Sequence, residues 1–360
     1  MSNAGGGTAT PEGVRGVGAR PRLEIPVMVF IGVLLLAALG AGAASLYREF
    51  YSPRAFVLHY LDLLQDHRAA EALAVPGVAI DSTELEAAGL PATASEALLR
   101  PDALQTVTNA VVTGESVEGD RTRVTVSYSV GGYSGTTTFD VEHDTGSTLL
   151  PRWRFARSPL SVMNLSVQGS MRFAVNGFDV DKRQVSIEGA DADPTAALPL
   201  LVFSPGLYSV AVDTAISSTP GVAVLADAPL AGIPVDVEAQ PTQEFLGVVQ
   251  ERVEDFLSSC AEQKVLQPTG CPFGFTVRNR IDDEPSWSIV RQPTVTLQPD
   301  GAGWRIPPAE AVAHIEVDIR SIFDGSVRTV EEDVDFTVDG QITVQPDGSA
   351  SILVGGSSSD

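Results

Sequence analysis

An apolar segment near the amino end sets the first limit on what this chain can fold into. Ile25 to Tyr47 carry no charged side chain, and a helix of that length, at ~1.5 Å per residue, is about long enough to cross a ~30 Å hydrocarbon layer. We therefore predict a transmembrane helix over residues 23–47. A cleaved signal peptide is the alternative, because residues 41–43 form an A-x-A site, although the apolar run is longer than a usual signal-peptide core.

The residues on either side of this segment predict its orientation. Residues 1–22 are rich in Gly, Ala and Pro, and we expect a disordered cytoplasmic tail. Their three arginines favour an amino end on the cytoplasmic side. We therefore expect a single-pass cell-membrane protein that contacts the membrane through residues 25–47 and whose later domains are extracytoplasmic.

The chain is strongly acidic. It has 23 Lys and Arg against 46 Asp and Glu, which gives a formal net charge of −23. Such a surface repels nucleic acid, so we expect no nucleic-acid partner. We interpret the acidity as a feature that keeps an envelope protein soluble.

The only two cysteines, Cys260 and Cys271, lie in one short stretch. In an oxidising extracytoplasmic space, an even pair with short separation is most simply a disulfide. A redox or metal role would need C-x-x-C spacing or nearby histidines, and neither occurs in this stretch. We predict a structural cross-link between Cys260 and Cys271.

Residues 50–158 predict helices followed by a sheet. Phe56, Tyr60 and Leu64 recur at helical spacing after Pro53, which suits a helix start. From Val111 the apolar period becomes two, as in the alternation that includes Val124, and Gly131-Gly132 turns the chain into a second strand. These patterns indicate an α+β domain.

The stretch A-F-x-x-x-Y-L-x-x-L-x-x-x-x-x-A-A-x-A-L, from Ala55 to Leu73, and the strand at Trp153 resemble the cone-shaped nuclear-transport-factor-two-like (cystatin-like) fold of membrane-anchored actinobacterial proteins. That resemblance implies a concave sheet that can hold a small hydrophobic molecule. The candidate cavity lining is Val124, Val126, Tyr128, Phe139, Val141, Trp153 and Phe155. It contains one phenol and no acid, so it does not suggest catalysis.

Residues 160–237 predict a small β module. Asn176-Gly177 is a strong turn dipeptide, and Pro205-Gly206 lies between two apolar runs. The combination V-N-G … F-S-P-G-x-Y-x-V resembles the small β modules of the membrane-anchored teicoplanin-resistance-associated family. The resemblance implies a β unit that extends from an anchored stalk and contacts a ligand or the cell wall.

Residues 240–354 predict a second helix-plus-sheet domain, followed by a disordered tail at 355–360. One apolar stripe indicates a helix that ends close to Cys260, and the cross-link would fasten it to a strand starting at Phe273. The stripe is formed by Phe245, Val248, Val249, Val253, Phe256 and Leu257. The pattern C-A-x-Q-x-x-L-x-P-x-G-C-P-F … W-x-I … P-x-V resembles a signature of uncharacterised exported actinobacterial proteins.

No residue pattern in the chain indicates catalysis or a cofactor. The four histidines, His59, His67, His143 and His314, are predicted to be surface or half-buried residues, not metal ligands. Acidic clusters such as Asp179 to Asp181 and Glu331 to Asp335 lack the order of a calcium loop, and we interpret them as solvated turns. We therefore expect no catalytic residues, no metal and no cofactor.

Together these patterns predict an α+β protein with an N-terminal transmembrane helix and two helix-plus-antiparallel-sheet domains separated by a small all-β module. We expect a non-catalytic binding or scaffold protein that contacts the cell wall or envelope proteins. The alternative is a protein that binds a lipid or another small hydrophobic ligand in the cone cavity or, less favoured, an enzyme. A ligand binder should show a pocket of about 300 Å³ or more with convergent polar groups.

Overall fold

The computed structural model describes residue 7 and residues 28–40, 51–144 and 152–358. Residues 28–40 are helical. No helix among the described residues is long and apolar enough to cross a membrane. Of the transmembrane helix predicted over 23–47, only residues 28–40 are described; residues 23–27 and 41–47 lie outside the described residues, as do residues 1–6 and 8–22 of the predicted tail.

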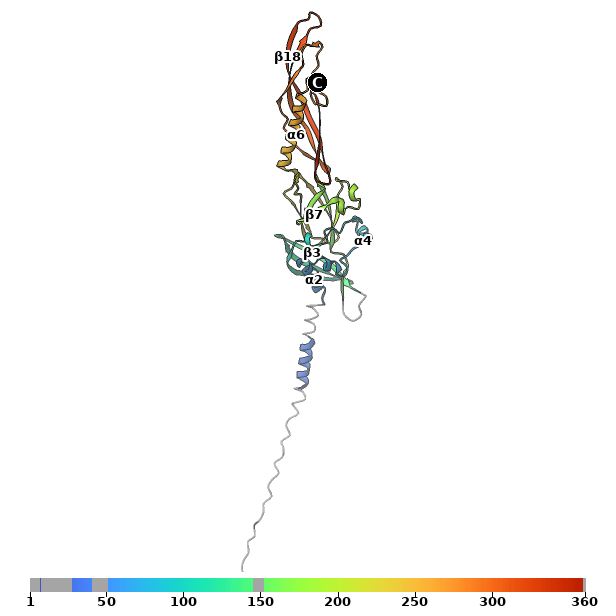
Figure 1. The fold of residues 1–360 in the computed structure, drawn as a ribbon. Helices are drawn as coiled ribbons and strands as arrows, with labels where there is room; N and C mark the ends of the chain where they lie inside the picture. The colour runs from blue at the N-terminus through green and yellow to red at the C-terminus, as the bar shows by residue number, and fades with distance from the viewer. Residues whose placement is uncertain (1–6, 8–27, 41–50, 145–151, 359–360) are drawn as a thin grey trace, which may run out of the picture.

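The base of the molecule, next to residues 28–40 in Figure 1, consists of short helices on a four-stranded antiparallel sheet. Ser52 caps the first helix, since its Oγ accepts a hydrogen bond from the Ala55 amide. Val124, Val126, Tyr128 and Val130 are buried and alternate with more exposed residues, which confirms the period of two. The elements are α2 (Pro53–Gln65), α3 (Ala69–Ala74), α4 (Ser82–Ala87), η1 (Pro101–Ala103), β1 (Val107–Glu118), β2 (Arg121–Val130), β3 (Tyr133–His143) and β4 (Trp153–Phe155).

Two sheets form the middle of the molecule. One has the order β12-β5-β8, with β12 parallel to β5, and the other has the order β11-β9-β6-β7. The predicted turn at Asn176-Gly177 is confirmed: both residues have positive φ and join β6 to β7. The elements are β5 (Leu160–Gln168), β6 (Arg172–Val175), β7 (Phe178–Asp181), α5 (Lys182–Val185), η2 (Gly189–Asp191), β8 (Leu198–Phe203), β9 (Gly206–Ala211), β10 (Ser217–Ser218), β11 (Val222–Ala226), β12 (Gly232–Glu238) and β13 (Gln240–Pro241).

The end of the molecule far from residues 28–40 is one helix beside a sheet built on a long hairpin (Figure 1). The helix buries Phe245, Val249, Val253 and Leu257, which recur every four residues, whereas Val248 of the predicted stripe is 47% exposed. No strand starts at Phe273; its ring instead packs between Trp287 and Phe336. The elements are α6 (Gln243–Ala261), β14 (Arg280–Ile281), β15 (Ser286–Arg291), β16 (Gln298–Asp300), β17 (Gly303–Arg320), β18 (Val327–Val344) and β19 (Ala350–Ser358).

The β12-β5-β8 sheet lies between two hydrophobic cores. Successive side chains of a strand point to opposite faces. Leu160, Val162 and Phe203 accordingly pack with α2 and the base sheet. Met163 and Leu200 point the other way, into a core that continues without a break into α6, β17 and β18.

The predicted fold class is wrong. The described chain is mostly β, with nineteen strands, and it is not two helix-plus-sheet domains held apart by a β module. The reason is that the middle strands belong to two hydrophobic cores. One face of β5 and β8 completes the base core, and the other face completes the core of the C-terminal part. Residues 355–358, predicted as a tail, belong to β19.

We expect Tyr60→Phe to lower the free energy of unfolding by about 1–3 kcal/mol, because it leaves a buried carbonyl without a donor. The Tyr60 hydroxyl donates to the Ser204 carbonyl at 3.0 Å and so joins α2 to the end of β8. Burial, and next the neighbouring Tyr208, raise the pKa of Tyr60, which keeps the phenol protonated. Urea unfolding measures the loss. Tyr133→Phe, at a half-exposed ring, is the control, and equal values for the two variants would contradict the prediction.

Candidate functional site: a polar cleft beside the middle sheets

A cleft of about 670 Å³ lies where the middle sheets meet the C-terminal hairpin. Its walls come from the start of β6, the β7–α5 junction, the loop before β10, and the turns at Ala302 and at 344–348. Six charged residues line it: Arg172, Asp179, Asp181, Arg183, Asp213 and Asp347. The cleft therefore has both the volume and the convergent polar groups expected of a ligand site.

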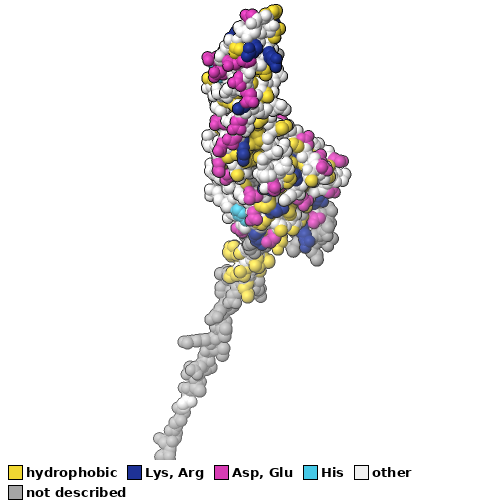
Figure 2. All heavy atoms as spheres, turned by 45° about the horizontal axis from the view of Figure 1, so that its top comes forward, with side chains coloured by type: hydrophobic (Ala, Val, Ile, Leu, Met, Phe, Trp, Pro, Cys, Tyr) yellow, Lys and Arg dark blue, Asp and Glu magenta, His cyan; other side chains and the backbone are white. Residues whose placement is uncertain are grey.

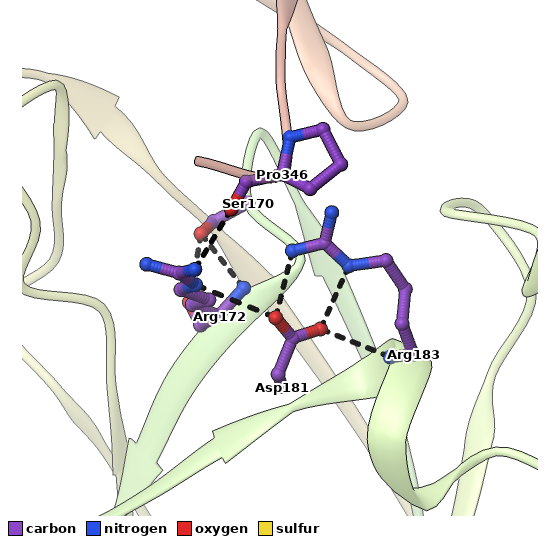
Figure 3. A network of polar contacts seen from close by, with 5 residues as sticks. All are labelled: Ser170, Arg172, Asp181, Arg183 and Pro346. Carbon is purple, nitrogen blue, oxygen red and sulfur yellow. Dashed lines mark hydrogen bonds and ion pairs between the residues drawn. The ribbon is translucent and has the colours of Figure 1, made fainter. Parts of the chain in front are cut away.

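Asp181 is the centre of the polar network in this cleft (Figure 3). Arg183 donates to both of its carboxylate oxygens, from Nε at 2.9 Å and from Nη2 at 2.7 Å, and the Arg183 amide adds a third bond at 3.0 Å. Arg172 Nε lies 3.4 Å from Oδ2 of the same carboxylate. One acid thus fixes two guanidinium groups.

Asp181 is ionised near neutral pH. Burial acts to raise the pKa of Asp181, but the hydrogen bonds from Arg183 and Arg172 outweigh it, so that the pKa is lowered. The hydrogen bond to Asp181 raises the pKa of Arg183. Two cations then share one anion, and the group of three carries one net positive charge on the cleft wall.

Arg172 also connects the two sides of the cleft. Its Nη2 donates to the Pro346 carbonyl at 2.8 Å, in the turn between β18 and β19 (Figure 3). The Ser170 hydroxyl donates to the Arg172 carbonyl at 2.7 Å and accepts from its amide at 3.1 Å, which fixes the start of β6. The Arg172 side chain is still 56% exposed, so its guanidinium can meet a ligand.

The candidate cavity-lining residues lie elsewhere, inside packed cores of the base. Val124, Val126, Phe139, Val141, Trp153 and Phe155 belong to the core beneath α2, where the Tyr60 and Phe155 rings are 5.2 Å apart. Tyr128 lies in a small separate cluster with Val107, Val130 and Leu207, and it also lines a shallow hollow beside Asp227. The structure therefore places six of these side chains in one packed core and Tyr128 apart from them.

The disulfide is confirmed. Cys260, in the last turn of α6, is bonded to Cys271, with the two Cα atoms 5.8 Å apart. The loop that it closes has further anchors: the Thr269 amide donates to the Gln263 side chain at 2.8 Å, and Trp287 Nε1 donates to the Val265 carbonyl at 2.9 Å. The cross-link fixes the helix end to this loop and lies away from the cleft.

The histidines are exposed or half-buried, as predicted. His67 bonds to Thr106, the His143 ring stacks on Trp153, and His314 pairs with Asp333. Within the described ranges, no three His, Cys, Asp or Glu side chains are grouped so as to hold a metal ion. The acidic stretch from Glu331 to Asp335 is part of strand β18 and not the predicted turn.

The cleft was not expected from the sequence, since Asp179 to Asp181 were interpreted as a solvated turn, although one signal pointed to the pairing of Arg172 with Asp181. A two-residue turn at Asn176-Gly177 pairs Val175 with Phe178, and counting outwards from there brings Arg172 opposite Asp181. The ion pair could therefore have been predicted from the sequence. Pro346 was not, because it follows Arg172 by 174 residues and only the tertiary fold brings it to the cleft.

Comparison of the chain with protein-family models, with curated proteins and with solved structures finds no match. The three family resemblances stay predictions, and the cleft has to be interpreted from its own chemistry.

Proposed function

We propose that this chain is an extracytoplasmic, non-catalytic binding protein whose ligand site is the cleft around Arg172, Asp181 and Arg183. The observation that carries the proposal is a cleft of about 670 Å³ with both signs of charge on its walls. The Cys260–Cys271 disulfide supports an oxidising compartment. Contact with envelope proteins, the leading hypothesis from the sequence, stays a prediction.

The state of Asp181 supports binding over catalysis. A general acid or base works best when its pKa lies near the operating pH. Hydrogen bonds from two arginines instead hold the pKa of Asp181 below its usual range. A carboxylate in this state positions the guanidinium groups and does not exchange protons near neutral pH.

The charges on the walls indicate the chemistry of the ligand. The half-exposed guanidinium of Arg172 suits a carboxylate, since Arg binds carboxylates in a planar, bidentate manner. Asp179 and Asp213 line the same cleft and suit an amine. We therefore propose a short polar ligand that carries both groups, such as a peptide fragment of the cell wall.

We expect soluble cell-wall peptide fragments to raise the melting temperature of the full chain, because a ligand that binds only the folded state stabilises it. Arg172→Ala should weaken the affinity at least tenfold, which is about 1.4 kcal/mol. Isothermal titration calorimetry gives the dissociation constants. Arg123→Ala is the matched control, because Arg123 is also a half-exposed arginine paired with an aspartate, but on the base sheet.

Equal binding by wild type and Arg172→Ala would contradict the proposed site. A shift with phospholipid vesicles and none with the peptide fragments would instead favour the alternative of a lipid-binding protein.

A further inference from the structure

The upper half of β18 is a strand edge with a neighbour on one side only. β17 pairs with nearly the whole length of β18, whereas β19 pairs with β18 only from Phe336 to Val344. Residues 327–334 therefore have no second strand beside them in the part of the chain that the structure describes. Their side chains are exposed or half-buried.

This edge is also free of β-bulges. The outer strand of the base sheet, β1, is interrupted by two register shifts, a common way to prevent further pairing. The pairing of β17 with β18 runs from Val327 to Val338 without a shift. An uninterrupted row of backbone groups is what an added strand needs.

The face of the hairpin beside this edge is acidic. Glu331 and Asp333 lie on β18, directly opposite Glu316 and His314 on β17. In Figure 2, Asp and Glu side chains gather along one side of this upper part. Because like charges facing each other across strands repel, a second copy of this edge is rejected. A segment of opposite charge is attracted.

The other face of the same edge carries Val330 and Val334, with the exposed Glu332 between them. Val330 and Val334 are half-buried and pack against the large core. Side chains alternate along a strand, so a segment paired here would direct every second residue towards the acidic face and the others towards these valines. The two faces together define the sequence that such a segment needs.

We propose that residues 327–334 bind an extended segment of a partner protein as an added antiparallel strand, and that this segment alternates basic and apolar residues. Main-chain hydrogen bonds to the open edge supply affinity. The acids on one face and the valines on the other supply specificity.

A labelled seven-residue peptide of alternating Lys and Val tests this proposal by fluorescence anisotropy with the full chain. We expect it to bind at least tenfold more tightly than a peptide of the same composition with its lysines in one block. N-methylation of alternate backbone amides should abolish binding, since it removes the donors that pair with the edge.

Charge reversal locates the site. The double variant Glu331→Lys, Asp333→Lys should no longer bind the Lys-Val peptide and should instead bind an alternating Glu-Val peptide. The matched control, Glu244→Lys with Glu251→Lys, makes the same change of net charge on the exposed side of α6 and should keep the original preference. Equal binding of the block peptide, or equal loss in the control, would show attraction by net charge alone and would overturn the proposal.

Discussion

Trp304→Ala is expected to lower the free energy of unfolding by about 3–5 kcal/mol, the range for truncating a large buried aromatic side chain. Trp304 is fully buried. On β17 it pairs with Pro299 of β16 on one side and with Ile342 of β18 on the other, and its ring meets that of Phe245 at 6.2 Å. Trp304 therefore links β16 and β18 through its backbone and α6 through its ring.

The middle of the molecule contacts the same tryptophan at Gly169. A Cβ at position 169 would lie only 3.2 Å from Cζ2 of the indole, and the φ of +82° is one that glycine adopts readily. The Gly169 amide donates to the Gly301 carbonyl at 3.0 Å. Truncation at 304 therefore opens a cavity in the core shared by the middle sheets and the hairpin.

Urea unfolding measures this loss, and Trp304→Phe is the control because it keeps a ring against Phe245. We expect the Phe variant to lose distinctly less than the Ala variant. A loss below about 1 kcal/mol for Trp304→Ala, typical of a surface position, would show that the core is not shared.

Replacing Cys260 and Cys271 together by serine is expected to lower the free energy of unfolding by about 3 kcal/mol. The cysteines are 11 residues apart, and closing a loop of roughly that size removes unfolded-state entropy of this order in the chain-entropy model. Because Cys260 is buried in the last turn of α6, the loss should appear in the unfolding of the C-terminal part.

Reduction of the wild type under the same conditions is the control, and it should reproduce most of the loss without any change of side chain. Thiol labelling of protein taken from intact cells tests the compartment separately. Two free thiols there would contradict the proposed extracytoplasmic location, whereas a stable double-serine variant would contradict only the energetic role of the bond.

Local features of the fold could be predicted from the sequence because short-range chemistry decides them. The helix after Ser52, the turn at Asn176-Gly177 and the disulfide each depend on a few neighbouring residues. The fold class was predicted wrongly because tertiary packing, and not local sequence, decides how the middle strands are shared. Residues 200–203 read Leu-Leu-Val-Phe, without alternation, and such a run is typical of a strand buried on both faces.

The candidate site shows the same division. The pairing of Arg172 with Asp181 follows from the turn, whereas the second guanidinium, from Arg183, depends on how α5 starts after β7. The resemblance to a cone-shaped fold directed attention to Val124 and Phe139, which the structure places in a core. The cleft instead lies at the junction of segments that are far apart in the sequence.

Strands β5 and β8, which pack on both faces, also govern how the molecule carries mechanical load. The chain is elongated, with the base at one end and the hairpin tip at the other (Figure 1). A pull between these ends passes through β5 and β8, whose side chains are shared by both cores. The molecule should therefore resist tension as a single mechanical unit, unlike a chain of separate domains joined by extensible linkers.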